Sequence, residues 1–285
     1  MSTIFKAACL QMNAQRDPAP NIESLRTLAR RARDAGADLI MSPEVSDMIE
    51  PDRAERFRKA RVEAEHPMLA AGRELARELG VHLLLGSIVT RIDETTLANR
   101  SLLIRPDSEI AARYDKIHMF DVDLATGERH RESAVFRPGE RAVTAALPWG
   151  VLGMSVCYDL RFAYLYRALA HAGADFLSIP AAFTVPTGRA HWHVLMRARA
   201  IETGCFVFAP AQWGEHATGR RTYGHSLVVA PWGEVLAEAE DAVGFIVAEI
   251  DPAKVLEARR QVPALSHDRS FAPPAAALKK TLAAE

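Results

Sequence analysis

The sequence GMSVCYDLRF, residues 153–162, places Cys157 between a predicted strand and a predicted helix. The apolar run 151–156 is typical of a short buried strand, and residues 162–172 predict a helix that ends at Gly173. A thiol at such a turn is held on a rigid element beside free backbone N–H groups, which suits a nucleophile. The alternative is a buried cysteine that acts as a small apolar residue, because a single cysteine without partners is weak evidence.

The composition indicates a globular protein with a large core. The chain has 285 residues, of which 49% are hydrophobic, and it contains no low-complexity linker. We therefore expect one domain over residues 1–270, followed by a Pro- and Ala-rich tail over residues 271–285, while the length alone is also compatible with two domains.

Charge and cysteine content limit the classes of partner. A net charge of −1 gives no general attraction to nucleic acid or to an anionic membrane surface. No apolar run approaches the roughly 20 residues that span a bilayer, and the N-terminus leads into a strand pattern without a signal sequence. The odd number and wide spacing of Cys9, Cys157 and Cys205 argue against a disulfide framework. We expect a cytoplasmic protein without nucleic-acid or membrane partners.

Predicted strands and helices alternate along the chain, which favours an α/β fold. Strands are expected at residues 5–12, 38–41, 81–88, 100–104, 110–114, 151–156, 206–211, 226–229 and 245–250, and helices at 21–35, 67–79, 162–172, 189–202 and 252–260. Asn21 is expected to cap its helix, the charged stretch 52–65 to be a solvated helix or loop, and the polar stretch 121–139 to be a long loop.

A weak internal repeat relates two parts of the chain. The sequence AGADLIMSPE at residues 35–44 is echoed by AGADFLSIPA at residues 172–181, and each copy reads as a helix end, a Gly stop and a strand. Chance similarity between two such junctions is the alternative. If the repeat is real, the fold is a four-layer α-β-β-α sandwich built from two similar α/β halves, and strand ends from both halves bring Glu44 near Cys157.

Glu44, Lys116 and Cys157 each follow an apolar strand, the position at which α/β sheets bind ligands. A thiol that attacks an amide needs a base, positive charge for the oxyanion and a proton donor for the leaving amine. Taken singly, Glu44 could equally be a solvated loop acid and Lys116 a surface lysine.

A metal-dependent hydrolase is the obvious competing class. His191 and His193 are two residues apart on a predicted helix and point to different sides, and neither an HExxH motif nor paired CxxC motifs occur. We therefore expect no metal and no cofactor, and we interpret His118 and His225 as hydrogen-bonding groups near the site. A papain-type Cys–His pair is possible in principle but lacks a local signature.

Taken together, these residues resemble the nitrilase, or carbon–nitrogen hydrolase, superfamily, whose signature is a Glu–Lys–Cys triad in this order. The resemblance covers nearly the whole chain. It includes Pro43-Glu44, YDKIHMFDV at residues 114–122, VCYDLRF at 156–162, AFT at 182–184, TG at 187–188, AHW at 190–192, RARAIE at 197–202 and YGHS at 223–226.

The resemblance implies a thiol-dependent amidase. Glu44 is then the base, Cys157 the nucleophile that forms a thioester, and Lys116 with the backbone N–H of Tyr158 the oxyanion donors. Glu132 aligns with a second family glutamate that orients the lysine and substrate; the alternative is a surface loop acid. The candidate substrate-binding residues are Arg161, Phe183, Thr184, Arg189 and His118.

Within the superfamily, the chain most resembles the Nit branch, and residues 209–214 and 223–226 look more like its deaminated glutathione amidases than its omega-amidases. The former release 2-oxoglutarate and cysteinylglycine, the latter ammonia from 2-oxoglutaramate or 2-oxosuccinamate. Both substrate types carry carboxylates, for which Arg161, Arg189, Arg220 and Arg221 are candidate ligands. Ala163-Tyr164 departs from the Pro-Glu usual in this branch and puts the pocket rim in question.

Two further hypotheses are a non-catalytic binding module on the same fold and a transferase in which another nucleophile resolves the thioester. The resemblance also implies a homodimer or higher homo-oligomer, with helix 189–202 and the C-terminal arm as contact surfaces.

Overall fold

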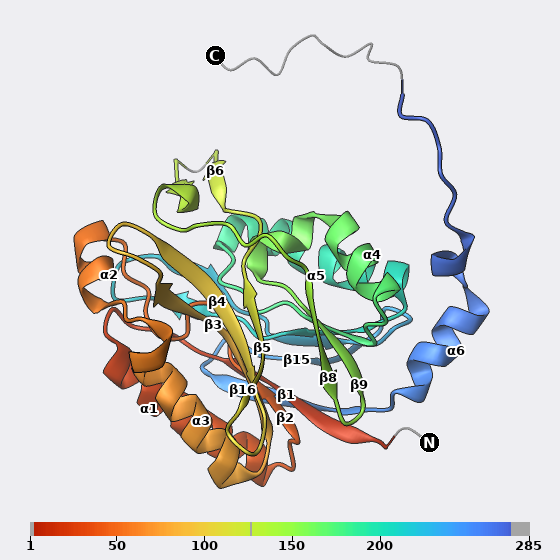
Figure 1. Cartoon of the computed structure of the whole chain (residues 1–285), viewed down its shortest axis with the longest axis horizontal. Coiled ribbons are helices and arrows are strands. Elements are labelled where there is room, and N and C mark those ends of the chain that lie inside the picture. Colours follow the sequence, from red (N-terminus) through yellow and green to blue (C-terminus); the bar gives the residue numbers. More distant parts are fainter. Residues whose placement is uncertain (1–2, 126, 275–285) are drawn as a thin grey trace.

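A computed structural model describes residues 3–125 and 127–274 of the chain. Two six-stranded sheets face each other, and helices cover the outer face of each sheet (Figure 1). This is the predicted four-layer α-β-β-α sandwich.

The first sheet has the strand order β16-β1-β2-β3-β4-β5. Its members are β1 (Phe5–Gln11), β2 (Leu39–Met41), β3 (His82–Arg91), β4 (Leu97–Ile104), β5 (Ile110–Asp115) and β16 (Gly244–Ile250). Strands β1, β2 and β3 are parallel, whereas β16, β4 and β5 join the sheet by antiparallel pairing.

The second sheet, of order β15-β14-β11-β10-β9-β8, repeats this plan. It comprises β8 (Val143–Leu147), β9 (Gly150–Met154), β10 (Phe176–Ser178), β11 (Phe206–Ala209), β14 (Leu227–Val229) and β15 (Val235–Glu238). Three parallel strands, β9 to β11, are flanked by one antiparallel strand on one side and two on the other. Strand β2 thus corresponds to β10, which confirms the repeat of residues 35–44 and 172–181.

Helices α1 (Pro18–Asp34) and α3 (Pro67–Leu79) pack on the first sheet, and α4 (Ala163–His171) and α5 (Val185–Thr203) on the second. The short helix α2 (Arg53–Lys59) precedes α3, and α6 (Ala253–Gln261) follows β16. Among the described residues, no helix has the length and apolar character needed to cross a membrane.

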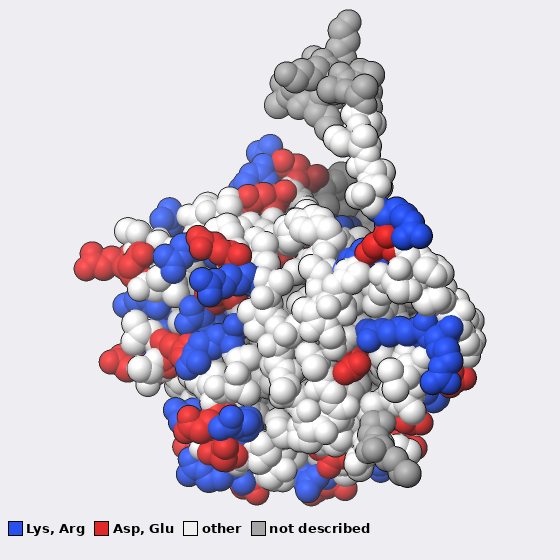
Figure 2. All heavy atoms as spheres, turned by 45° about the vertical axis from the view of Figure 1, so that its right-hand side comes forward, with Lys and Arg blue, Asp and Glu red and all other residues white. Residues whose placement is uncertain are grey.

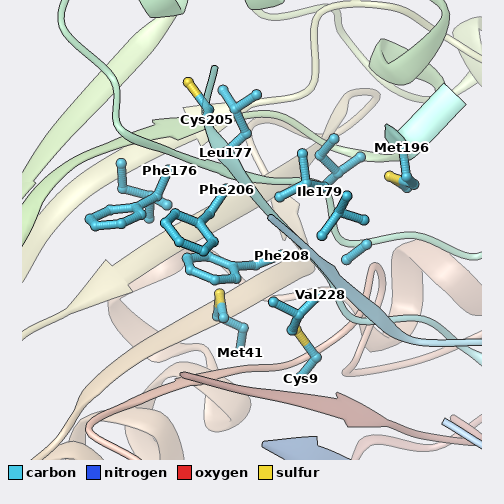
Figure 3. Close-up of a cluster of buried hydrophobic side chains, with 14 of the residues drawn as sticks. Cys9, Met41, Phe176, Leu177, Ile179, Met196, Cys205, Phe206, Phe208 and Val228 are labelled. Carbon is cyan, nitrogen blue, oxygen red and sulfur yellow. The ribbon is translucent and has the colours of Figure 1, made fainter. Parts of the chain in front are cut away.

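The core forms two layers because strand side chains alternate between the faces of a sheet. On β1, Ala7 and Cys9 face the second sheet, whereas Ala8 and Leu10 pack under the helices of the first. Figure 3 shows the layer between the sheets, where Phe208 of β11 lies near Met41 of β2.

Several predicted boundaries were wrong. Helix α1 begins at Pro18 after Asp17, because proline suits the first turn of a helix, so Asn21 lies inside α1 and does not cap it. The side chain of Asn21 is buried and donates to Asp47 O at 2.7 Å. Helix α5 likewise begins at Val185, with proline in its first turn, four residues before the prediction.

The predicted loop 121–139 is partly ordered as a hairpin. It contains β6 (Asp121–Asp123), β7 (Arg129–Arg131) and a 3-10 turn over Glu132–Ala134. The sequence pattern also did not predict β8, β15 or the hairpin of β12 (Trp213–Glu215) and β13 (Arg221–Tyr223). Most of these strands are short or largely exposed, so they lack an apolar pattern. Residues 271–274 of the predicted tail have no regular structure, and residues 275–285 lie outside the described residues.

Candidate active site

Four predicted residues meet where the two sheets end. Glu44 follows β2, Lys116 follows β5, Cys157 follows β9 and Glu132 begins the 3-10 turn after β7. The side chains of Glu44, Lys116 and Cys157 are buried, and that of Glu132 is largely buried. Because Glu44 and Lys116 come from the first sheet and Cys157 from the second, the site exists only when the two sheets are packed together.

Cys157 lies in a strained turn between β9 and α4, residues 155–162, which is called the elbow below. Its φ of 50° lies in the left-handed region, which is costly for a residue with a Cβ and is found at functional turns. The Cys157 N–H donates to Pro180 O at 2.8 Å. A 3-10 turn, Cys157–Arg161, follows directly, and only then does α4 begin. The N–H of Tyr158 therefore lies at the start of a helical turn, where backbone donors have no partner within the turn.

Asp159 holds this elbow from behind. Its buried carboxylate accepts hydrogen bonds from the Val156 N–H at 2.9 Å and the Tyr114 hydroxyl at 2.6 Å. His118 also bonds to Asp159, through its backbone N–H at 3.0 Å and its Nδ1 at 2.7 Å, and its ring stacks on Phe162. His118 does not line the cavity described below, so in this structure it supports the elbow from outside the cavity.

Lys116 lies between two carboxylates. Its Nζ donates to Glu44 Oε1 at 2.9 Å and to Glu132 Oε1 and Oε2 at 3.0 and 2.7 Å. Asn99 Nδ2 donates to the same two acids, at 3.0 and 3.1 Å, and the Phe120 N–H donates to Glu132 Oε2 at 2.7 Å. Sequence reasoning missed Asn99, a single polar residue just outside the predicted strand 100–104, because no motif distinguishes it.

Glycine 86 of β3 allows this approach of the strand ends. A Cβ built at Gly86 would lie 1.8 Å from Ser42 O and 2.9 Å from Pro43 O, so a larger residue there would displace the segment that carries Glu44. From the other side, Gln212 Nε2 donates to Glu44 O at 2.9 Å. The position of Glu44 is thus fixed by contacts from both halves of the fold.

The protonation states suit an attack by the thiol. Burial raises the pKa of Cys157 and the neighbouring Glu44 charge raises it further, so the thiol is protonated at rest. Burial would raise the pKa of Glu44, but Lys116 and Cys157 hold it below its ordinary value, and Glu44 is ionised. Burial opposes the charge of Lys116, yet Glu132 and Glu44 raise its pKa well above the ordinary value. The site therefore combines a neutral thiol, an ionised base and a cation.

These groups open into a cavity of about 760 Å³. Arg161, Phe183 and Tyr158 line it together with the four residues above, as does Thr187, whose hydroxyl shares a hydrogen bond with Thr184 at 2.8 Å. Thr184 itself is buried behind the wall. The structure does not bring Arg189 to the cavity, since this residue is exposed on α5 and absent from the lining.

The cavity wall is rich in arginine. Besides Lys116 and Arg161, its cationic residues are Arg53, Arg56, Arg129, Arg131, Arg220 and Arg221. Ala163-Tyr164, the departure from the expected motif, does not line it. Tyr164 is 67% exposed, and its hydroxyl lies 2.5 Å from His118 Nε2, so the substitution lies outside the cavity.

A possible metal-ligand set within residues 3–125 and 127–274 lies elsewhere. The donor atoms of His193, His225 and Glu238 are within 4.8 Å of one another, and none of these residues lines the cavity. His225 was expected near the site, but its Nδ1 contacts Glu238 at 2.7 Å instead. These three side chains take no part in the chemistry considered below.

Comparison with known proteins identifies the family of the chain. The family model described as carbon-nitrogen hydrolase matches residues 6–260. A deaminated glutathione amidase of Yersinia enterocolitica is 39% identical, with 92% of each chain covered, and that of Homo sapiens is 38% identical over 92% of this chain and 81% of the human protein.

Among solved structures, the nitrilase and fragile histidine triad fusion protein NitFhit of Caenorhabditis elegans superimposes with a TM-score of 0.88 at 36% identity. The match covers 94% of this chain and 66% of the NitFhit chain, so this chain spans just under two thirds of that protein. The chain therefore belongs to the carbon–nitrogen hydrolase family and is a hydrolase of C–N amide bonds.

Proposed function

We propose that the protein hydrolyses its amide substrate through a thioester on Cys157. Glu44 takes the thiol proton as the sulfur attacks the amide carbon, and the carbonyl oxygen gains the negative charge. Lys116 Nζ and the Tyr158 N–H stabilise this oxyanion; a single such donor contributes about 3–4 kcal/mol to the barrier in comparable sites. Glu44 then returns its proton to the leaving nitrogen, so that the C–N bond breaks and the amine departs.

Water completes the cycle. Glu44, again ionised, removes a proton from a water molecule that attacks the thioester carbon. The C–S bond breaks, the carboxylic acid leaves, and the proton returns to the Cys157 sulfur. Glu132 keeps Lys116 protonated and in position throughout. The single observation that supports these roles is the contact of Lys116 with both acids at 2.7–3.0 Å beside the Cys157 thiol.

The proposed substrate is deaminated glutathione, which would be cleaved to 2-oxoglutarate and cysteinylglycine. The relatives bearing that name support this assignment, and the size and cationic lining of the cavity suit a substrate with two carboxylates. Arg161 is the proposed ligand of the carboxylate on the acyl half. Arg161 ends the 3-10 turn that begins at Cys157. Its guanidinium lies 5.5 Å from the Phe183 ring centre and 5.7 Å from the Tyr158 ring centre.

A comparison of kcat/KM tests the assignment. With purified protein, deaminated glutathione should be preferred over 2-oxoglutaramate and 2-oxosuccinamate, because only the larger substrate reaches the whole cavity. A higher kcat/KM for 2-oxoglutaramate would instead make the protein an omega-amidase. If the protein turned over neither these amides nor simple amides, the result would favour the non-catalytic binding module.

We further propose that the protein is a homo-oligomer in a reducing compartment such as the cytoplasm. Residues other than Lys, Arg, Asp and Glu occupy much of the face shown in Figure 2, which brings forward the right-hand side of Figure 1. The apolar side chains of Val194 and Ile201 on α5 and Leu256 on α6 are 68%, 54% and 64% exposed. The three cysteines are free, which suits a reducing compartment. Light scattering should give a mass above the 31.3 kDa monomer, and Val194→Glu should lower it.

A further inference from the structure

Two arginines in the cavity wall form no ion pair with a carboxylate of the described residues. Arg56 lies on α2, and Arg220 lies in the turn between β12 and β13. Both line the cavity that contains Glu44 and Cys157. Across residues 3–125 and 127–274, the hydrogen bonds of the two guanidinium groups go to backbone carbonyls and to no carboxylate.

The surroundings of Arg220 leave a buried donor unused. Its Nη2 donates to Ala182 O at 2.7 Å, which ties the side chain to the wall close to Cys157. Its Nε is buried and has no hydrogen-bond partner among the described residues. A buried, unpartnered donor on a charged group costs free energy until a ligand accepts its hydrogen bond.

Arg56 faces the same region from the other half of the fold. Its Nε donates to Glu50 O at 2.8 Å, and its guanidinium lies 5.6 Å from the centre of the Phe136 ring. Burial lowers the pKa of Arg56; the charge of Glu50 opposes this shift, whereas the charge of Arg220 adds to it. Two like charges that are partly withdrawn from water would be stabilised by an anion between them.

Some other charged residues of the cavity are already paired. Arg129 and Arg131 bind Asp123 at 2.9 and 2.7 Å. The carboxylate of Glu50 accepts hydrogen bonds from Arg16 at 2.8 Å and Lys59 at 2.9 Å, so it is not free to neutralise Arg56. Arg53, Arg161 and Arg221 of the lining also have no carboxylate partner among the described residues. Arg56 and Arg220 are distinguished by the repulsion between their charges and by the unpartnered Arg220 Nε.

We infer that Arg56 and Arg220 bind a carboxylate on the amine half of the substrate, the half that departs when the C–N bond breaks. This inference rests on the proposed function, in which Arg161 binds the acyl half. Deaminated glutathione carries such a carboxylate on its terminal glycine, whereas the leaving group of 2-oxoglutaramate is ammonia. The planar guanidinium groups supply paired donors that match a carboxylate. The pair therefore selects amides whose leaving amine is anionic.

The test compares two substrates that differ in one group: deaminated glutathione and its analogue with a carboxamide in place of the glycine carboxylate. The wild-type protein should prefer the acid in kcat/KM by about 10- to 100-fold, the range expected for a charge-assisted hydrogen bond. Arg220→Met and Arg56→Met should each reduce that preference about tenfold or more, by slowing the acid and sparing the carboxamide. Arg129→Met is the matched control, because Arg129 lines the same cavity but is paired with Asp123, and the preference should persist.

Calorimetric binding to a Cys157→Ala protein separates this inference from the proposed function. Dissociation constants need no turnover, so they report the acid-over-carboxamide preference even if the wild-type protein cleaves neither compound. Tighter binding of the acid that is lost in the Arg220→Met and Arg56→Met backgrounds supports the inference. Equal binding of acid and carboxamide, or a preference that both substitutions leave unchanged, overturns it. Failure of turnover with the preference intact would overturn only the proposed reaction.

Discussion

Replacing Glu132 by glutamine should slow catalysis without unfolding the protein. The carboxylate of Glu132 accepts four hydrogen bonds: two from Lys116 at 3.0 and 2.7 Å, one from Asn99 at 3.1 Å and one from the Phe120 N–H at 2.7 Å. An amide has the same shape but only one accepting oxygen. In either orientation its NH₂ group would face a donor, so at least one bond to Lys116 and one other would be lost.

The magnitude follows from the charge on Lys116. A hydrogen bond to a charged group contributes about 1.5–3 kcal/mol, and about 1.4 kcal/mol corresponds to a factor of ten in rate. We therefore expect kcat of Glu132→Gln to fall about 10- to 100-fold, with a smaller change in KM. Glu132 is also the largest cause that raises the pKa of Lys116, so the basic limb of the pH–rate profile should move to lower pH.

Formation of 2-oxoglutarate, followed by a coupled reductive amination, measures this effect. Circular dichroism and thermal unfolding establish that the variant is folded. Glu74→Gln is the control, because Glu74 pairs with Arg26 on the surface at 2.9 Å, and its rate should not change. The role assigned to Glu132 would be refuted if Glu132→Gln kept kcat within twofold of the wild type and its basic limb did not shift.

Three further predictions concern the base, the strand ends and the core. Because the pKa of Glu44 is held below its ordinary 4.5, the base stays ionised as pH falls, and kcat/KM should not decline between pH 7 and about pH 5; an acid limb near pH 6.5 would contradict this. Gly86→Ala should cost about 1–3 kcal/mol in urea unfolding and lower kcat/KM at least tenfold, since its Cβ would meet Ser42 O; wild-type stability and rate would disprove the tight approach. Phe208→Ala should lose about 3–5 kcal/mol, and a loss below 1 kcal/mol in the same assay would show that the layer between the sheets is loosely packed.

Much of the fold could be predicted because its strands are apolar and its helix ends are marked. Gly80 ends α3 as expected, and the repeated AGAD motif leads into β2 and β10, which occupy equivalent places in the two sheets. The predicted proximity of Glu44 and Cys157 follows from that equivalence. Strands such as β12 and β13 were missed because they are short and only partly buried, so no hydrophobic period marks them.

The parts of the site that could not be predicted depend on contacts across the sheets. Nothing in the local sequence distinguishes Asn99, which acts through hydrogen bonds to two acids from distant segments. Arg56 stands in a charged stretch that resembles a solvated helix, and only the packing of α2 against the cavity withdraws its guanidinium from water. His118 carries a family motif, yet its neighbours place it behind the elbow and not in the cavity.

Turnover by a Cys157→Ala protein tests the central claim most directly, with Cys205→Ala as the control because Cys205 is buried in the core away from the cavity. We predict no detectable release of 2-oxoglutarate from deaminated glutathione by folded Cys157→Ala, and wild-type release by folded Cys205→Ala. Measurable turnover by Cys157→Ala at a rate near that of the wild type would contradict a reaction that passes through the Cys157 sulfur.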